Sequence, residues 1–280
     1  MRRWTLLLLL SAAACQDNQT HPEDHGAYEA GAAAPLSCVP NLDGRIDASE
    51  LQPVLSSPVR YLVSPANVSR TVDLAGTTDA SGHLVWDFGT DYADDQIATI
   101  EATPLAGKWY AATFPGGQFV TPFDAGDTLE AVYSQDDNGL YIHGLASTQQ
   151  TPPEGQTLYA YASPVTLYVF PLTAGATWTT TGVVQPGGML RGLPYAGKDT
   201  YDGSDVAVGQ LLLPAFTFQQ AHRVRFVVTA APAAGANVVL RQDSFLFECF
   251  GEIARATSHP GETSDDFTSA AEVRRFGPQP

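Results

Sequence analysis

The chain has 280 residues, of which 44% are hydrophobic, so it is long enough to bury a sizeable core in one large domain or two small ones. Its formal net charge is −16 at pH 7, and a surface of that sign repels nucleic acid and anionic lipid headgroups, which excludes both as expected partners. The carboxylates are expected to solubilise the surface, with loose cation binding as the alternative.

The N-terminus has the features of a bacterial lipoprotein signal peptide. Met1–Arg3 is basic, Trp4–Leu10 is an unbroken apolar run, and small residues follow up to Cys15. The apolar run is too short to cross a hydrocarbon layer of about 30 Å as a helix, so it is expected to act as a leader rather than as a lasting anchor. The segment Ala12-Ala13-Ala14-Cys15 resembles the lipobox of bacterial lipoproteins, whose cysteine is acylated and becomes the mature N-terminus.

Cleavage is therefore predicted after residues 1–14, with palmitate-type acyl chains on Cys15. Ala12 stands where the lipobox usually has leucine, and an ordinary signal peptidase would accept Ala12-x-Ala14 and cut the same bond. Two or three acyl chains anchor a protein stably, whereas one binds a membrane only marginally. Gln16 in place of aspartate favours the outer membrane, by resemblance to lipoprotein sorting signals. We expect a protein of the cell envelope whose lipid anchor makes the membrane its partner, at the periplasmic face or at the cell surface.

The cysteine count predicts a disulfide in the rest of the chain. There are three cysteines, and lipidation of Cys15 leaves Cys38 and Cys249 to form a bridge in an oxidising compartment. The alternative is that both are reduced, buried residues. Residues 15–37 are polar and then rich in alanine and glycine, which predicts a flexible tether before a body spanning residues 38–277.

A possible calcium motif opens the body. The segment from Asn41 to Glu50 matches an EF-hand loop from its third to its twelfth position, with Gly44 at the sharp turn and oxygen ligands on Asn41, Asp43, Asp47 and Glu50. Val39 stands where the first aspartate should be, and prolines interrupt the entering helix. A capping box explains Asp47 and Glu50 without a metal and predicts one helical turn over residues 48–52. Calcium is therefore a weak expectation.

From Pro58 onward, short runs of β-branched and aromatic residues alternate with turn residues, which predicts an all-β body of mainly antiparallel sheets, in a sandwich or half-open barrel with very little helix. Asp136-Asp137-Asn138-Gly139 predicts a tight hairpin turn in which Asn138 and Gly139 take positive φ. Residues 151–155 are a possible seam, interpreted as a loop within one sheet system. Further strands are predicted over residues 165–170, 206–213 and 223–229, and one long or bulged strand pair over residues 238–256. Residues 267–276 could form a strand or a short helix, of which we expect the strand.

No catalytic constellation is visible, so we do not expect an enzyme. The histidines have no metal-ligand spacing, and neither a nucleophile elbow nor a phosphate-binding glycine loop is present. Glu248 and Glu252 could serve acid–base chemistry, but a surface-exposed strand face explains them more simply.

The second half of the chain resembles a group of uncharacterised secreted lipoproteins of Gram-negative bacteria. The segments that carry the resemblance lie between Leu129 and Phe276 and are Leu140–Gly144, Phe170–Trp178, Leu213–Arg225 and Phe247–Arg255, the last with the sequence FECFGEIAR. The resemblance implies a β-rich body and an envelope location, without a known activity. The strand order is more distantly similar to the half-open β-barrels that carry lipoproteins or lipids across the periplasm.

Two functional classes follow. The first is a non-catalytic envelope lipoprotein that has a structural role or binds a protein or glycan partner. The second is a periplasmic carrier that holds an apolar or lipid ligand in a half-open β-barrel. A carrier needs a continuous apolar cavity of several hundred cubic ångströms. Its lining could include Phe216, Phe218, Phe226, Phe245 and Phe247, although ordinary core packing also explains these rings.

Overall fold

A computed structural model describes residues 38–124 and 126–278 of the protein. These residues form an all-β body of mainly antiparallel sheets that are not closed into a barrel, which confirms the predicted fold class. Two short 3₁₀ turns are its helical elements within the described residues, η1 (Ala48–Glu50) and η2 (Ala111–Thr113). None of the helical segments in this part of the chain is long and apolar enough to cross a bilayer. Cys15, the leader and the tether lie outside the described residues.

The larger sheet contains the C-terminal strands and two strands from the start of the body. Its strand order is β4 (Thr77–Thr78), β5 (Leu84–Asp87), β16 (Gly197–Leu212), β17 (Thr217–Pro232), β18 (Val238–Phe247), β19 (Gly251–Ser258), β20 (Ser269–Phe276), β2 (Val59–Val63) and β6 (Gln96–Ile100). In addition, β13 (Thr177–Val183) pairs with β16, and β3 (Arg70–Thr71) pairs with β20. β5 runs parallel to β16, whereas the other pairs are antiparallel.

The smaller sheet comes from the middle of the chain. Its order is β15 (Leu193–Pro194), β14 (Met189–Leu190), β11 (Leu158–Val169), β10 (Gly139–Ser147), β9 (Leu129–Asp136), β8 (Phe119–Pro122) and β7 (Thr103–Pro104). A separate strand pair joins β1 (Arg45–Ile46) to β12 (Leu172–Thr173). The possible seam at residues 151–155 lies in the loop between β10 and β11, which are neighbours in this sheet.

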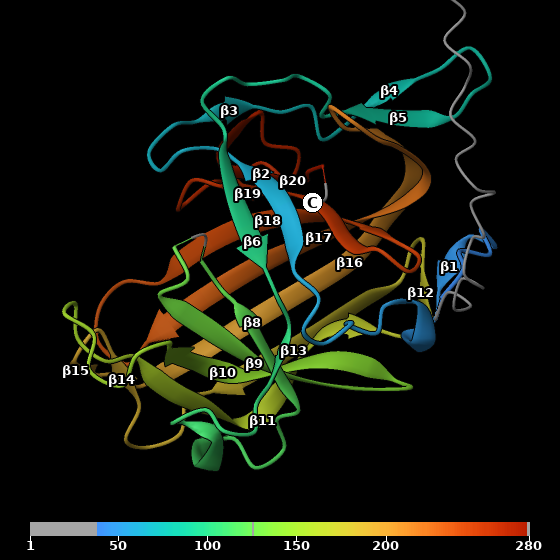
Figure 1. The fold of residues 1–280 in the computed structure, drawn as a ribbon. Coiled ribbons are helices and arrows are strands. Elements are labelled where there is room, and N and C mark those ends of the chain that lie inside the picture. The colour runs from blue at the N-terminus through green and yellow to red at the C-terminus, as the bar shows by residue number, and fades with distance from the viewer. Residues whose placement is uncertain (1–37, 125, 279–280) are drawn as a thin grey trace, which may run out of the picture. The chain divides into compact units, whose positions relative to one another are not determined.

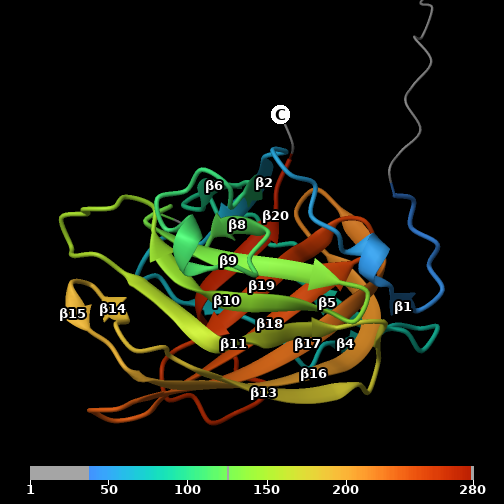
Figure 2. The same cartoon turned by 90° about the horizontal axis from the view of Figure 1, so that it is seen from below.

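The two sheets form two layers with apolar side chains between them. Figure 2 shows β9, β10 and β11 stacked over β16, β17 and β18, and the long C-terminal strands cross the body in Figure 1. One core cluster joins Ile46, Leu172, Val224, Phe226 and Leu246, which come from β1, β12, β17 and β18. Tyr168 of β11 belongs to the same cluster, so the first strand of the body packs against both layers.

The predicted hairpin is present, but its turn differs from the expected one. β9 ends at Asp136 and β10 begins at Gly139, and these two residues are register partners. Neither Asn138 nor Gly139 has a positive φ, so that part of the prediction was wrong. Instead, the Asp136 carboxylate accepts the backbone N–H groups of Asn138 and Gly139 at 2.8 and 3.0 Å. A side chain at Gly139 would meet the Tyr168 carbonyl oxygen, so glycine is needed there for a close strand approach.

Candidate functional site

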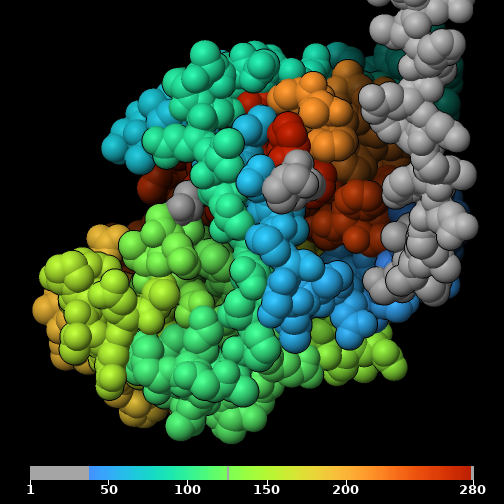
Figure 3. All heavy atoms as spheres, viewed as in Figure 1, coloured from blue at the N-terminus to red at the C-terminus, as the bar shows by residue number. Residues whose placement is uncertain are grey.

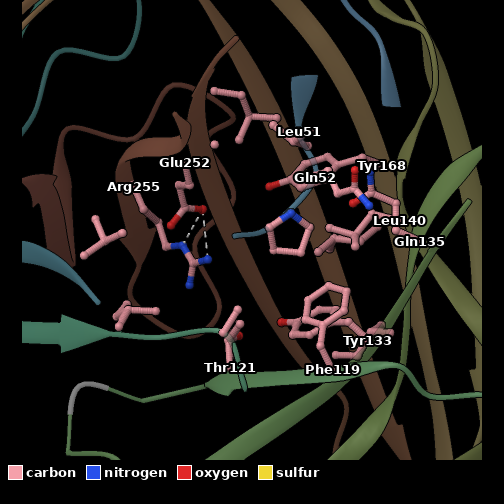
Figure 4. A pocket seen from close by; sticks show the side chains of 18 of the residues that line it. Leu51, Gln52, Phe119, Thr121, Tyr133, Gln135, Leu140, Tyr168, Glu252 and Arg255 are labelled. Atoms are coloured by element: carbon pink, nitrogen blue, oxygen red, sulfur yellow. Dashed lines mark hydrogen bonds and ion pairs between the residues drawn. The ribbon is translucent and has the colours of Figure 1, made fainter. Parts of the chain in front are cut away.

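A cavity of about 430 Å³ lies where both sheets meet the first residues of the body. Figure 4 shows part of its lining. The smaller sheet contributes aromatic and aliphatic side chains that include Phe119, Tyr133, Ile142, Leu167 and Tyr168. The larger sheet contributes a second apolar wall that includes Tyr61, Phe226, Val228 and Leu246. Small-molecule sites in proteins typically have volumes of about 300–1,000 Å³ and mostly apolar linings, so this cavity has the size and character of one.

The third wall is the N-terminal segment, defined here as residues 38–54, of which Glu50 to Val54 line the cavity. The predicted disulfide between Cys38 and Cys249 is present, with a Cα–Cα distance of 5.5 Å. Next to it, the backbone N–H groups of Asn41 and Leu42 donate to the Glu248 carboxylate at 2.6 and 2.8 Å. The Cys249 N–H donates to the Glu50 carbonyl oxygen at 2.7 Å. In Figure 3 this segment (blue) lies on the surface beside the red C-terminal strands and the green smaller sheet.

The cavity face of the larger sheet carries a row of polar side chains. Ser244, Arg255 and Arg274 occupy directly opposite positions on β18, β19 and β20. The Glu252 carboxylate accepts hydrogen bonds from Arg255 Nε and Nη2 at 3.0 and 2.9 Å, and from Ser244 Oγ at 2.8 Å. These side chains are mostly buried: Ser244 is fully enclosed and Arg274 has 4% of its side chain exposed. The row is a charged strip in a mainly apolar enclosure.

Glu252 and Arg255 form a stable ion pair. Although burial alone would lower the pKa of Arg255, the adjacent Glu252 carboxylate holds it above the ordinary arginine value. Figure 4 shows this pair on one side of the cavity and Gln135, Leu140 and Tyr168 on the other.

The smaller sheet faces this strip with polar groups that keep their protons. Burial raises the pKa of the Tyr133 and Tyr168 hydroxyl groups, so both rings stay neutral hydrogen-bonding groups at physiological pH. Gln135 Nε2 donates to the Ala48 carbonyl oxygen at 2.6 Å, whereas its buried Oε1 has no protein partner. A buried polar atom without a partner is costly, so a bound molecule with a donor group would be stabilised there.

The residues of the possible calcium motif are engaged with one another. Glu50 accepts the backbone N–H of Asp47 at 2.9 Å and the side-chain amide of Asn41 at 2.8 Å, so the capping box is present on a shorter turn than predicted. Arg45 contacts the carboxylates of Asp43 and Asp47 at 3.4 and 2.9 Å. Within residues 38–124 and 126–278, no three histidine, cysteine, aspartate or glutamate side chains are grouped so that they could hold a metal ion. The motif shapes the N-terminal segment.

The expectation of an exposed face for Glu248 and Glu252 was wrong, and most of the five phenylalanines follow the core-packing alternative. Glu248 and Glu252 do not lie on an exposed face, because Glu248 is 2% exposed and Glu252 lies in the cavity wall. Of the five phenylalanines suggested as a lining, Phe226 is in the cavity wall. The other four belong to the core cluster of the larger sheet or pack against it: Phe216, Phe218, Phe245 and Phe247.

Two histidines pair with polar side chains outside the cavity lining. His143 Nε2 lies 2.8 Å from Ser134 Oγ, and burial lowers the pKa of this histidine. His222 Nδ1 lies 2.7 Å from Asp205 Oδ2, with both side chains fully enclosed. Each pair lacks a third member that would complete a nucleophile–base–acid set among its recorded contacts. His143 has the character of a structural histidine, whereas His222 is paired at Nδ1 and its buried Nε2 has no hydrogen-bond partner among the described residues.

No protein family matches the chain, and no curated protein or solved structure was found to match it. The site must therefore be interpreted from its own geometry. Sequence reasoning missed Arg255, Arg274, Tyr133, Tyr168 and Gln135, which come from four strands of two sheets.

Proposed function

We propose that the protein is a lipid-anchored lipoprotein of the cell envelope that binds a small, mainly apolar ligand in this cavity without catalysing a reaction. The cavity carries the proposal, because a carrier needs a continuous apolar space and this one measures about 430 Å³. Both of its carboxylates are engaged, Glu252 by Arg255 and Ser244 and Glu50 by Asn41 and the Asp47 N–H, so neither is poised as a free base. The leader and Cys15 support the envelope location.

A ligand could reach the cavity from the surface without unfolding of the body. Three apolar residues of the lining, Val54, Phe123 and Phe250, are 62%, 44% and 47% exposed. They come from the N-terminal segment, the loop after β8 and the turn between β18 and β19. Exposed apolar groups at the rim of an apolar space are typical of ligand-binding openings.

Filling the cavity should prevent binding. Leu140 is half-buried in β10 and lines the cavity, so Leu140→Trp replaces its side chain with a larger indole ring inside the cavity. We expect the affinity for the neutral fluorescent probe N-phenyl-1-naphthylamine to fall by about tenfold or more, which corresponds to about 1.4 kcal/mol of lost binding energy. The measurement is a fluorescence titration of the Cys15→Ser chain, which an ordinary signal peptidase is expected to release in soluble form.

Ile97→Trp is the matched control, because Ile97 is 69% exposed on β6 and lies outside the cavity lining. It adds the same ring and should leave probe binding unchanged. Equal affinities in the two variants would show that the probe binds elsewhere. If neither they nor the parent chain bind the probe, a protein or glycan partner at the outer surface becomes the better proposal. Native mass spectrometry of the protein purified from its own envelope would then identify what it carries.

The anchor is tested at Cys15. We expect the full-length chain to fractionate with membranes, to require detergent for extraction and to carry the added mass of acyl chains. Cys15→Ser should instead appear in the soluble periplasmic fraction, because the hydroxyl cannot form the thioether that holds the lipid and the leader can still be cut before residue 15. An unmodified Cys15 on a chain that is soluble without detergent would contradict the proposed anchor.

A further inference from the structure

The charged strip of the cavity contains more positive than negative charge. Arg255 and Arg274 are direct cross-strand neighbours, an arrangement in which like charges repel. Glu252 is the carboxylate of the larger sheet that reaches them inside the cavity, and both of its recorded arginine contacts go to Arg255. Glu50 also lines the cavity, but its hydrogen bonds come from the Asn41 amide and the Asp47 backbone N–H and not from an arginine. Among the described residues, one of the two guanidinium groups therefore has no contact with a buried counterion.

Arg274 is the guanidinium without that counterion. Its Nε is buried and has no hydrogen-bond partner, although the side chain is 4% exposed and lines the cavity. Its recorded carboxylate contact is from Nη2 to Glu272 at 3.3 Å, and the Glu272 side chain is 34% exposed, where water weakens the attraction. Burial lowers the pKa of Arg274 and the adjacent Arg255 lowers it further. Glu252 and Glu272 oppose this without reversing it, so the cation is held in an unfavourable place.

Arg255 also has one guanidinium nitrogen that does not bond to Glu252. Its Nε and Nη2 both bond to one oxygen of Glu252, and in Figure 4 the third nitrogen points away from that carboxylate. Arginine donors recognise carboxylates through short, charge-assisted hydrogen bonds that are stronger than neutral ones. Arg255 and Arg274, which carry these donors, line the same cavity as the apolar side chains of Leu140, Leu167 and Leu246.

We propose that the cavity binds a single-chain amphiphile with a carboxylate head, and that Arg274, assisted by Arg255, receives the head while the apolar walls hold the chain. This inference rests on the proposed ligand-binding function and names the class of ligand. A carboxylate head would give Arg274 the buried anionic contact that the described residues do not supply. A neutral lipid would leave Arg274 Nε unsatisfied.

The test compares two competitors that differ in the head group. Decanoate and decanol have the same chain length, and each is titrated against bound N-phenyl-1-naphthylamine on the Cys15→Ser chain near neutral pH. We expect decanoate to displace the probe at a concentration about tenfold or more below that of decanol, as a charge-assisted contact to a buried donor implies. In Arg274→Met this preference should fall to within about twofold. The ratio of the two displacing concentrations is the readout, because a change in probe affinity affects both competitors alike.

Two further variants keep the test decisive. Arg274→Lys retains the charge, so it should fold even if Arg274→Met does not. It lacks the planar donor fork of arginine, so it should keep less than a third of the decanoate preference. Arg241→Gln is the matched control. Arg241 lies on the face of β18 opposite to that of Gln242 and Ser244, and it pairs with Asp265. It should leave the preference intact.

The outcomes separate the two proposals. If the parent chain does not bind the probe, the proposed function fails. If it binds the probe but does not distinguish decanoate from decanol, the proposed function stands and the carboxylate inference is overturned. An undiminished preference for decanoate in both Arg274→Met and Arg274→Lys would overturn it as well, because the head group would then lie elsewhere.

Discussion

Replacing Cys38 and Cys249 together by serine is expected to lower the free energy of unfolding by up to about 5 kcal/mol, because the disulfide joins residues separated by 211 positions and so restrains most of the unfolded chain. The loss should be seen in urea unfolding followed by circular dichroism. Neighbouring contacts remain, since Glu248 still accepts the N–H groups of Asn41 and Leu42. The variant should therefore fold, at reduced stability.

The reduced wild-type chain is the control for the serine variant. Dithiothreitol should bring the wild type to the stability of the variant, and it should have no effect on the variant itself. Thiol labelling of the denatured, unreduced wild type should find neither Cys38 nor Cys249 reactive. A change of less than about 1 kcal/mol would mean that the bridge restrains little that the native contacts do not already hold.

The disulfide also has a consequence for the cavity. Cys249 lines it, and the bridge fastens the segment whose residues Glu50 to Val54 form one wall. If that wall loosens, probe affinity should fall before the body unfolds. Measuring probe binding at urea concentrations below the unfolding transition would separate this local effect from the global one.

The parts of the fold that the sequence predicted are those with local signals. The hairpin at Asp136 to Gly139, the strands over residues 165–170 and 223–229 and the capping box at Asp47 follow from alternation, turn chemistry and spacing, which act over a few residues. The disulfide followed from counting cysteines. The strand over residues 238–256 was predicted as one long or bulged pair and is β18 and β19, joined by a turn in which Cys249 and Gly251 have positive φ.

The pairing of distant strands could not be predicted in this way. β20 pairs with β2 from the start of the body, and β5 lies parallel to β16, so each contact joins segments far apart in the sequence. Nothing local in either partner specifies the other. The cavity depends on these pairings, because they place Tyr61 of β2 beside residues of β19 and the smaller sheet.

The charged strip was missed for a related reason. In Ile253-Ala254-Arg255-Ala256, the arginine alternates with small apolar residues, a pattern that usually indicates one polar, solvent-facing side of a strand. Here the side that carries Arg255 faces a second sheet. Glu248 was placed at the surface by the same reasoning and is buried, because the N-terminal segment covers it. Alternation shows that two faces differ without showing which one water reaches.

The second large effect is expected at Arg223, where Arg223→Met should lower the free energy of unfolding by about 3–5 kcal/mol, the usual cost of removing one partner of a buried ion pair. Arg223 has 4% of its side chain exposed and contacts Asp243 and Asp266 at 2.6 Å each. It also donates to the Leu74 carbonyl oxygen. The Asp243 side chain is fully buried, so the variant leaves its carboxylate with Arg225 at 3.7 Å as the remaining ion-pair contact.

The exposed pairs of Arg45 provide the matched control. Arg45 also contacts two carboxylates, Asp43 and Asp47, but half of its side chain is exposed. Arg45→Met should therefore cost no more than about 1 kcal/mol, because water screens the pair. Similar losses at the two arginines would show that burial is not what makes the Arg223 contacts important.

The loss at Arg223 should depend on pH in a defined direction. Burial raises the pKa of Asp243 to about 6, and Arg223 is the first of the groups that oppose this rise. Without Arg223 the native-state pKa should rise further, so the variant's native state takes up a proton at a higher pH than the wild type does. Because a raised native pKa favours the native state as the pH falls, the difference in stability between variant and wild type should be largest at alkaline pH. It should shrink as the pH falls toward about 6 and stay constant at its smallest value below that, where Asp243 is protonated in both native states.

A second substitution tests the same cause. Asp243→Asn in the Arg223→Met background removes the buried charge, so the double variant should recover part of the lost stability and lose the extra pH dependence of the single variant. Urea unfolding at pH 5 and pH 7.5 measures both effects. A constant loss across that range, with no recovery in the double variant, would mean that the cost of removing Arg223 comes from its packing and its bond to the Leu74 carbonyl oxygen rather than from the unpaired Asp243 carboxylate.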